Sequence, residues 1–344
     1  LKREIDGLGK FSIDYMKNLV ISKKATIIIP THKLLDAALE QSKGDKKIGS
    51  TLKGIGPTYQ DKIGRTALRV GDILSPDFKE KYEALVAKHK TTLSFYSHPL
   101  DELPGMEEQF FAAVEFFKTL NLIDSEYVVN EALDSNKRIL AEGAQGSLLD
   151  VDFGSYPFVT SSTMTSGACT GLGVAPSKIG EVFGIFKAYC TRVGSGPFPT
   201  ELFDQDGEDM RKEGNEFGST TGRPRRCGWL DLPALRYSIM INGVTQLFMM
   251  KGDVLNIFEQ IKVCTHYELP SGERIDKLSF EITEQEVSPV YKTMKGWNRS
   301  LENIHSYDNF PTELKEYVEY LEAELNVPIK LVSVGPDRTQ TIMR

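Results

Sequence analysis

The stretch "VTQLFMMKGD" (residues 244–253) joins an apolar run to a charged end that contains a glycine. The same arrangement returns in "IKLVSVGPD" (329–337). A short apolar run that gives way to a polar loop is typical of a buried strand in an α/β protein. Ligands of open α/β sheets lie beyond the carboxyl ends of the strands, so these two loops are candidate binding segments.

Strand-like and helix-like stretches alternate along the chain. "ATIIIP" (25–30) is predicted to be a buried strand, and "RILAEGAQG" (138–146) and "EVFGIFKAYCTRVG" (181–194) are predicted to be strands that run into glycine-containing loops. Apolar residues recur at helical spacing over 76–96, 105–120 and 311–325. The alternation predicts an α/β fold with a largely parallel central sheet flanked by helices. We expect one large domain over residues 1–344, with a helical subdomain at 76–136.

Composition narrows the class of protein. The 344 residues carry a formal charge of −7, which argues against a general nucleic-acid or membrane-surface binder. Four cysteines without metal spacing indicate a reduced, cytoplasmic protein, and no apolar run approaches the ~20 residues of a membrane span. The chain begins at Leu1 inside a helical pattern, which suggests that it is trimmed or a fragment.

Two glycine-containing stretches have the composition of phosphate or base loops. In residues 47–72, Gly49, Gly54 and Gly56 surround Ser50 and Thr51, so amides and hydroxyls could enclose a phosphate, although a surface turn explains the glycines equally well. In residues 142–162, Gln145 stands between glycines, and its amide could read a purine edge. The hydroxyl run that starts at Thr160 suits phosphate, but a helix cap is the more common use of such residues.

Three later strand ends carry further candidates. Residues 187–202 place Arg192, Val193 and Gly194 after a strand, where glycine backbone could approach a ribose or form a simple structural turn. Lys251 and Asp253 could cover and read a guanine base, with the turn at 333–338 completing the pocket. A lone lysine–aspartate pair at a strand end is more often merely solvated.

The stretch "EFGSTTGRPRRCGWLD" (216–231) places Arg223, Arg225 and Arg226 behind a glycine- and threonine-rich segment. Arginine binds carboxylate and phosphate through two parallel hydrogen bonds. A solvated basic turn is the alternative, but mutual repulsion disfavours an idle cluster of arginines. We therefore expect this loop to close on a small dianion such as a dicarboxylic acid.

Taken in order, these stretches resemble the adenylosuccinate synthetase family. The resemblance lies in "GSTLKGIGPTYQDKIGR", "EGAQGSLLDVDFGSYPFVTSS", "KAYCTRVGSGPFPTEL", "TTGRPRRCGWLDLPALRY" and "SVGPDRT", and it extends from about Leu1 to Arg344. It implies a P-loop-NTPase-like fold and the GTP-dependent, Mg²⁺-requiring ligation of IMP with L-aspartate. It also implies a cytoplasmic homodimer active in AMP synthesis.

The resemblance assigns roles to individual residues. The IMP-binding positions that it implies are Thr51, Arg65, Gln145, Thr160, Val193, Gly194 and Arg223, with Arg65 reaching the partner's IMP and Gln145 in an assisting catalytic role. The aspartate-binding positions are Ser219, Thr220, Thr221, Gly222, Arg223 and Arg225. The GTP-binding positions are Arg225, Lys251, Gly252, Asp253, Ser333, Val334 and Gly335.

Two departures from the family pattern affect the expectation. The guanine segment reads "MKGD" where the family usually has a threonine first and a bulkier residue at Gly252, yet Lys251 and Asp253 remain. The family's phosphate loop, its catalytic aspartate and histidine and its metal ligand have no match, and His32 matches no catalytic position. We therefore expect the base and the Mg²⁺ ligands upstream of Leu1, and little activity from residues 1–344 alone. The alternative is a non-catalytic nucleotide-binding or dimerisation module, and another GTP-dependent C–N ligase finds no supporting feature.

Overall fold

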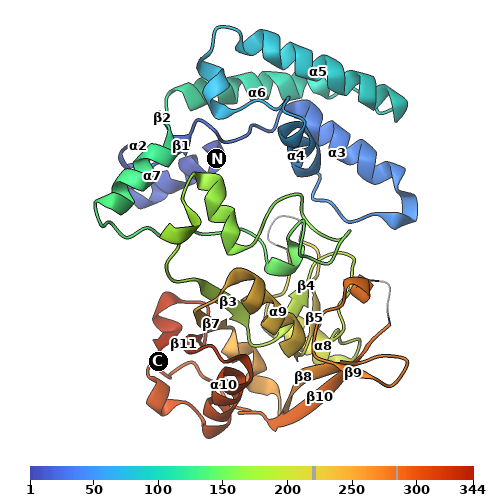
Figure 1. Cartoon of the computed structure of the whole chain (residues 1–344), viewed down its shortest axis with the longest axis vertical. Coiled ribbons are helices and arrows are strands. Elements are labelled where there is room, and N and C mark those ends of the chain that lie inside the picture. Colours follow the sequence, from blue (N-terminus) through green and yellow to red (C-terminus); the bar gives the residue numbers. More distant parts are fainter. Residues whose placement is uncertain (219–221, 284–285) are drawn as a thin grey trace. The chain divides into compact units, whose positions relative to one another are not determined.

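The computed structural model describes residues 1–218, 222–283 and 286–344. The chain folds as two compact units (Figure 1). Unit 1 comprises residues 1–143, 160–162 and 168–176, and unit 2 comprises residues 144–159, 163–167 and 177–344. The predicted single-domain organisation with a helical subdomain at 76–136 stays a prediction.

Unit 1 is mainly helical. Its helices and strands are α1 (Lys2–Leu8), α2 (Tyr15–Asn18), β1 (Val20–Ser22), α3 (Pro30–Ser42), α4 (Ile55–Ile63), α5 (Phe78–Phe95), α6 (Leu103–Lys118), β2 (Asn121–Ile123) and α7 (Ser125–Asp134). The long helices α5 and α6 lie side by side (Figure 1) and pack through the stacked rings of Tyr82 and Phe110, whose centroids are 5.2 Å apart. The two short strands pair in parallel. The helical predictions for 76–96 and 105–120 are confirmed.

Unit 2 contains the sheets. Its elements are β3 (Phe183–Lys187), β4 (Cys190–Arg192), α8 (Gln205–Glu213), β5 (Arg226–Gly228), β6 (Leu230–Asp231), α9 (Leu232–Asn242), β7 (Gln246–Met250), β8 (Gln260–Glu268), β9 (Arg274–Ile275), β10 (Ser288–Lys295), α10 (Thr312–Leu325), β11 (Ile329–Ser333) and β12 (Thr341–Met343). The predicted strands in 244–253 and 329–337 and the predicted helix at 311–325 are therefore confirmed.

One four-stranded sheet of unit 2 has the order β12-β11-β7-β3, and its central pairs β11–β7 and β7–β3 are parallel. A second sheet has the order β10-β8-β6, with β9 beside β8. The α/β class with a largely parallel sheet is confirmed for the first of these. Because β3, β7 and β11 run the same way, their carboxyl ends meet at one edge.

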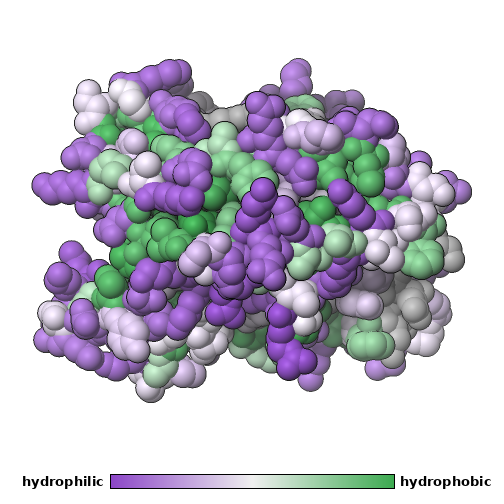
Figure 2. Space-filling model, turned by 90° about the horizontal axis from the view of Figure 1, so that it is seen from above, coloured by the Kyte–Doolittle hydropathy of each residue, from purple (hydrophilic) through white to green (hydrophobic). Residues whose placement is uncertain are grey.

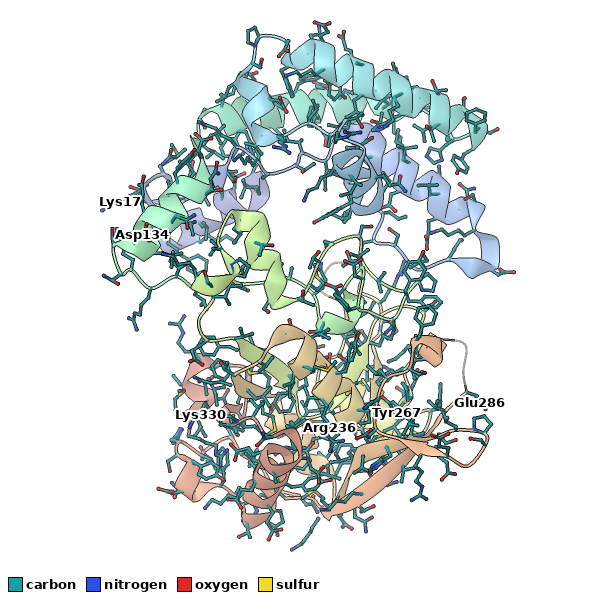
Figure 3. All side chains as sticks on the ribbon, in the orientation of Figure 1. Lys17, Asp134, Arg236, Tyr267, Glu286 and Lys330 are labelled. Atoms are coloured by element: carbon teal, nitrogen blue, oxygen red, sulfur yellow. The ribbon has the colours of Figure 1, made fainter. Side chains whose placement is uncertain are left out.

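Buried aromatic and aliphatic side chains form the core of unit 2, among them Trp229, Leu247 and Tyr317. Polar contacts fix the elements around this core. Arg236 of α9, labelled in Figure 3, donates from Nε to the carbonyl of Glu324 at 3.2 Å and so ties α9 to α10.

Two predicted strands do not form. Thr26 makes only an isolated bridge with Arg69, residues 27–29 belong to no strand, and α3 already begins at Pro30, although Ile29 is fully buried as expected. Residues 138–146 are irregular and exposed. A strand needs a neighbouring backbone to accept and donate its hydrogen bonds, and none of the described strands runs beside 138–146. The prediction for 181–194 is right in kind, but the segment divides into β3 and β4.

None of the described helices is both long enough and apolar enough to cross a bilayer. Figure 2 shows one face of the molecule, on which hydrophilic side chains predominate and apolar patches lie between them. All four cysteines are unpaired.

Candidate active site

The carboxyl ends of β7 and β11 bring the predicted guanine-binding residues together. Val332 is paired with Met249, so the segments 251–253 and 333–335 follow neighbouring strands at the same edge. Gly252 is buried against the second segment, since a Cβ on it would lie 3.3 Å from the carbonyl oxygen of Ser333. Val334 is buried as well. The structure thus brings together two segments that are distant in sequence.

Asp253 has an unused acceptor at this edge of the sheet. Its Oδ1 atom is buried and has no hydrogen-bond partner among the described residues. Burial raises the pKa of this carboxyl group, since little in the protein stabilises its charge. A buried acceptor without a partner costs free energy, so a ligand with N–H donors would be stabilised here.

The arginine loop is held by a narrow β-ladder. β4 and β5 pair antiparallel, and an isolated bridge joins Phe217 to Pro224 near the end of the loop. Gly222, at φ +65°, donates to the carbonyl of Gly218 at 2.7 Å, and Gly218 donates to the carbonyl of Arg223 at 2.8 Å. The predicted aspartate-binding residues Ser219, Thr220 and Thr221 lie outside the described residues.

Glu216, immediately before this loop, is a buried acceptor for several cations. Its fully buried carboxylate accepts hydrogen bonds from Lys187 at 2.7 Å, Lys251 at 3.0 Å, Arg225 at 2.6 Å and the hydroxyl of Tyr189. Burial alone would raise the pKa of Glu216, but these hydrogen bonds and the nearby positive charge hold it at about 2. Two predicted ligand-binding side chains, Arg225 and Lys251, are therefore ion-paired within the protein.

Arg226 corrects one expectation about the arginine cluster. Its guanidinium binds both carboxylate oxygens of Glu201 and donates to the carbonyls of Gly194 at 3.1 Å and Gly196 at 2.9 Å. These partners use its donors to hold the turn after β4. Of the three arginines expected to grip an anion, Arg226 is thus structural, and the carbonyl of Gly194 accepts one of its hydrogen bonds.

Arg192 corrects a second expectation. Its guanidinium donates to the carbonyls of Ser195 and Phe158 and to the hydroxyl of Ser155, all of them neutral acceptors. Burial lowers the pKa of Arg192 to about 10. Gly196, at φ +106°, passes so close that a Cβ would lie 2.3 Å from Nη2 of Arg192. That glycine therefore makes room for an arginine of the protein and not for a ligand.

A close backbone approach at the base of the loop yields a stability prediction. A Cβ on Gly228 would lie 2.1 Å from the carbonyl oxygen of Thr200, across the bridge between Glu201 and Gly228. Because a backbone atom cannot rotate away, we expect Gly228→Ala to lower the free energy of unfolding of unit 2 by about 1–3 kcal/mol.

Urea titration followed by tryptophan fluorescence measures this effect, because both tryptophans, Trp229 and Trp297, lie in unit 2. Gly180→Ala is the matched control, since a Cβ there meets nothing within 4 Å. Equal midpoints for the two variants would contradict the close approach.

Unit 1 contains the predicted residues Thr51, Arg65 and Thr160. Thr51 is exposed, and Arg65 is exposed at φ +61° just after α4. The segment 160–162 lies near the start of α4, since a Cβ on Gly56 would be 3.6 Å from Oγ of Ser161.

The glycine-rich stretch before α4 is not an open phosphate loop in this structure. The amides of Gly49 and Ser50 donate to the carboxylate of Glu40, and the amide of Gly54 donates to Asp36 at 2.9 Å. Two carboxylates thus occupy the amides that were expected to enclose a phosphate, and their negative charge would repel one.

A buried polar cluster joins α3, α4 and α5 in unit 1. Nε2 of His32 and Nε2 of His89 lie 2.9 and 2.7 Å from Oδ2 of Asp61, while Lys88 and Thr66 donate to Oδ1. Burial lowers the pKa of His32 to about 4. Burial would raise the pKa of Asp61, but the donors around it outweigh burial and hold it well below its usual range.

This cluster is the one group of three potential metal ligands among the described residues, and it does not suit Mg²⁺. Magnesium prefers six oxygen ligands in octahedral geometry, whereas two of the three groups here are imidazoles. The ammonium of Lys88, 2.6 Å from Asp61, already supplies the positive charge. The cluster is therefore a buried hydrogen-bond network within unit 1.

The remaining predicted IMP-binding residues lie in unit 2. Gln145 is exposed at φ +65° on the irregular segment before residue 147, and Val193 is exposed after β4. Arg223 follows Gly222 in the arginine loop. The predicted IMP residues are thus divided between the two units.

Comparison with known proteins connects these segments to one family. The sequence model of adenylosuccinate synthetase matches residues 1–342. The chain belongs to the adenylosuccinate synthetase family. An adenylosuccinate synthetase of Cytophaga hutchinsonii is 60% identical over 344 residues, which are 100% of this chain and 80% of that protein. One from Porphyromonas gingivalis is 55% identical, with 100% and 81% covered.

Solved structures agree with this assignment. The fully ligated adenylosuccinate synthetase of Plasmodium falciparum superposes with a TM-score of 0.91 at 34% identity, over 100% of this chain and 82% of that one. A cyanophage S-2L succinoaminodeoxyadenylate synthetase reaches a TM-score of 0.54 at 19% identity, over 94% and 68%, and shows likeness of fold alone.

The function expected from the sequence is confirmed. As an adenylosuccinate synthetase, the protein is a ligase of purine synthesis that joins IMP and L-aspartate at the expense of GTP and releases GDP and phosphate. The family uses Mg²⁺ and takes GTP as co-substrate. The expectations of a missing amino-terminal segment and of an inactive chain gain no support from these comparisons, which match residues 1–342 of the chain.

Proposed function

We propose that the edge formed by β7 and β11 is the guanine site of this ligase. The residues assigned to it are Lys251, Gly252, Asp253, Ser333, Val334 and Gly335. The observation that carries the proposal is the buried, unpartnered Oδ1 of Asp253 beside the turn that follows β11. A guanine base presents two neighbouring donors, the ring N1–H and the exocyclic amine, and one carboxylate can accept from both.

We further propose that the arginine loop, residues 219–225, binds the aspartate substrate. Arg223 and Arg225 are its carboxylate-binding side chains, and Arg225 also contributes to the GTP site. Arg225 already binds a carboxylate, that of Glu216, at 2.6 Å. Its geometry is thus suited to the group that aspartate would offer.

For IMP we propose Thr51, Arg65 and Thr160 in unit 1 and Gln145, Val193, Gly194 and Arg223 in unit 2. Gln145 is also proposed to assist catalysis. We place Arg65 across a homodimer interface, where it contacts the IMP of the partner. In support, Arg65 is exposed and makes no ion pair within the described part of the chain, and Ile63, two residues before it, has an exposed apolar side chain.

The site of Mg²⁺ is proposed to lie outside the His32 cluster, for the reasons of ligand type and charge given above. A cytoplasmic location is proposed for the enzyme because its three substrates, IMP, aspartate and GTP, are cytoplasmic metabolites.

The aspartate loop is tested by Arg223→Ala in the complete gene product. A charge-assisted hydrogen bond contributes about 1.5–3 kcal/mol, so we expect the KM for aspartate to rise about 10- to 100-fold. The KM for GTP should change by less than about threefold. Initial rates of adenylosuccinate formation at saturating levels of the other substrates measure both constants.

Arg299→Ala, at an exposed arginine of the same unit, is the control and should leave both constants unchanged. Equal losses for aspartate and GTP in the Arg223 variant would contradict the assignment of the loop.

A further inference from the structure

Glu216 connects four segments of unit 2 through one carboxylate. Lys187 ends β3, Lys251 follows β7, Arg225 precedes β5, and Tyr189 lies between β3 and β4. All four donate to Glu216, which is fully buried. Among the described residues, no other carboxylate forms a hydrogen bond or ion pair with any of these four side chains.

The backbone reinforces these contacts. The amide of Arg225 donates to the carbonyl of Glu216 at 2.9 Å, and Lys251 donates to the carbonyl of Gly214 as well as to the carboxylate. Lys251 has a φ of +61°, a conformation that most side chains avoid, so its ammonium is held toward Glu216 at some conformational cost. The arrangement therefore depends on Glu216 at both its main chain and its side chain.

The charges around Glu216 do not cancel. Three cations, Lys187, Arg225 and Lys251, surround one carboxylate, and each cation remains partly exposed, with 24%, 27% and 34% of its side chain accessible. Burial lowers the pKa of Lys187, and the nearby charges of Lys251 and Arg225 lower it further. Without Glu216, these three side chains would repel one another and separate.

We propose that Glu216 is a positioning residue that couples the guanine site to the aspartate loop. It holds Lys251, the proposed guanine-covering side chain, and Arg225, a proposed aspartate-binding side chain, in one hydrogen-bonded cluster. The inference rests on the proposed function, because it takes the roles of Lys251 and Arg225 from there.

The physical basis of the coupling is shared ordering. A nucleotide that packs on the stem of Lys251 fixes its ammonium against Glu216, and a fixed carboxylate in turn orients the guanidinium of Arg225. Aspartate then binds to a loop that is already ordered, so less conformational entropy is lost on binding. By thermodynamic linkage, aspartate must increase the affinity for the nucleotide by the same factor. The two ligands should therefore increase each other's affinity without touching.

The experiment measures this coupling at equilibrium with unreactive probes. GDP replaces GTP, and succinate replaces aspartate, because it has the two carboxylates but no amine. The Kd of GDP is measured by titration calorimetry on the complete gene product with saturating IMP, with and without saturating succinate. In the unmodified enzyme we expect succinate to tighten GDP at least fivefold, and in Glu216→Gln we expect this factor to fall to about one.

Glu201→Gln is the matched control. Glu201 is also a carboxylate that binds an arginine of this region, Arg226, but it does not contact Lys251 or Arg225. A merely structural weakening would affect both variants, whereas the coupling should disappear only in the Glu216 variant. If Glu216→Gln does not fold, the double variant Lys187→Met/Glu216→Gln takes its place. It keeps the net charge of the cluster, because it loses one cation together with the carboxylate. The same loss of coupling is expected for it.

Two results would overturn the inference: no coupling in the unmodified enzyme, or coupling that persists without the Glu216 carboxylate. Failure of the proposed function gives a different pattern. In that case Lys251→Ala would leave the Kd of GDP unchanged, or Arg225→Ala would leave the Kd of succinate unchanged. If both single variants weaken their ligands while Glu216→Gln retains the coupling, the site assignment stands and the inference fails.

Discussion

Asp253→Asn is expected to lower kcat/KM for GTP about 100- to 1,000-fold while leaving the KM for aspartate nearly unchanged. The carboxylate would accept two charge-assisted hydrogen bonds from guanine, each contributing about 1.5–3 kcal/mol. Asparagine turns one of these acceptors into a donor that faces the exocyclic amine. The buried position of Oδ1 makes the mismatch costly, because water does not reach it.

The same substitution should change which base is preferred. Xanthine keeps the ring N1–H but presents an oxygen in place of the exocyclic amine, so it matches an asparagine at residue 253. We expect XTP to be used better than GTP by the variant, and the ratio of the two kcat/KM values measures this. Asp276→Asn, at an exposed aspartate of unit 2, is the control. An unchanged GTP-to-XTP ratio would remove Asp253 from the base-reading role.

Unit 1 is expected to lose about 3 kcal/mol of stability as the pH falls from about 6.5 to about 4. His32 is buried and neutral, with a pKa lowered from 6.5 to about 4. Below pH 6.5 the unfolded chain binds a proton at His32 that the folded protein does not bind until about pH 4. The unfolded state therefore gains in this window, at 1.36 kcal/mol for each pKa unit. Asp61, whose pKa is lowered, adds a further loss below about pH 4.

Hydrogen exchange resolves this effect by unit. Peptides from α3, α4 and α5 should lose protection on acidification, after correction for the intrinsic rate, before peptides from β7 and β11 do. His32→Gln removes the titrating group, so its unit 1 should be less stable at pH 7 but less sensitive to pH between 6.5 and 4. His305→Gln, at an exposed histidine, should behave like the unmodified protein. Parallel loss of protection in both units would speak against this origin.

The strands that could be predicted are those with partners. β7 and β11 occur as apolar runs before polar loops, and each finds a parallel neighbour in the same sheet. Residues 25–30 and 138–146 have the same local pattern, but the first makes only an isolated bridge with Arg69 and the second pairs with none of the described strands. Local sequence reports the tendency to extend, whereas a strand also requires a second backbone at hydrogen-bonding distance.

The site could be predicted in part for a related reason. Loops after parallel strands converge at one sheet edge, so residues 251–253 and 333–335 could be placed together from their positions alone. The partners of individual arginines could not. Arg226 pairs with Glu201, and Arg192 finds neutral acceptors, because the fold brings those groups near, and no spacing in the sequence indicates it.

Glu216 is the functional candidate that sequence reasoning missed. It appears as the first letter of the arginine stretch, where a single glutamate gives no signal. Its partners come from positions 187, 189, 225 and 251. One clue was available, namely that a loop with three arginines needs a negatively charged group nearby.

The order of strands in the sheet of unit 2 also bears on how the protein is made. β11 lies between β7 and β12, yet it follows β7 by about eighty residues in the chain. At a synthesis rate of about 5–20 residues per second, roughly 4 to 16 s pass between the two strands. During that interval one edge of β7 has no native neighbour, and an uncovered strand edge invites pairing with other chains. The strand that completes this sheet edge therefore also ends a period in which the nascent protein is open to aggregation.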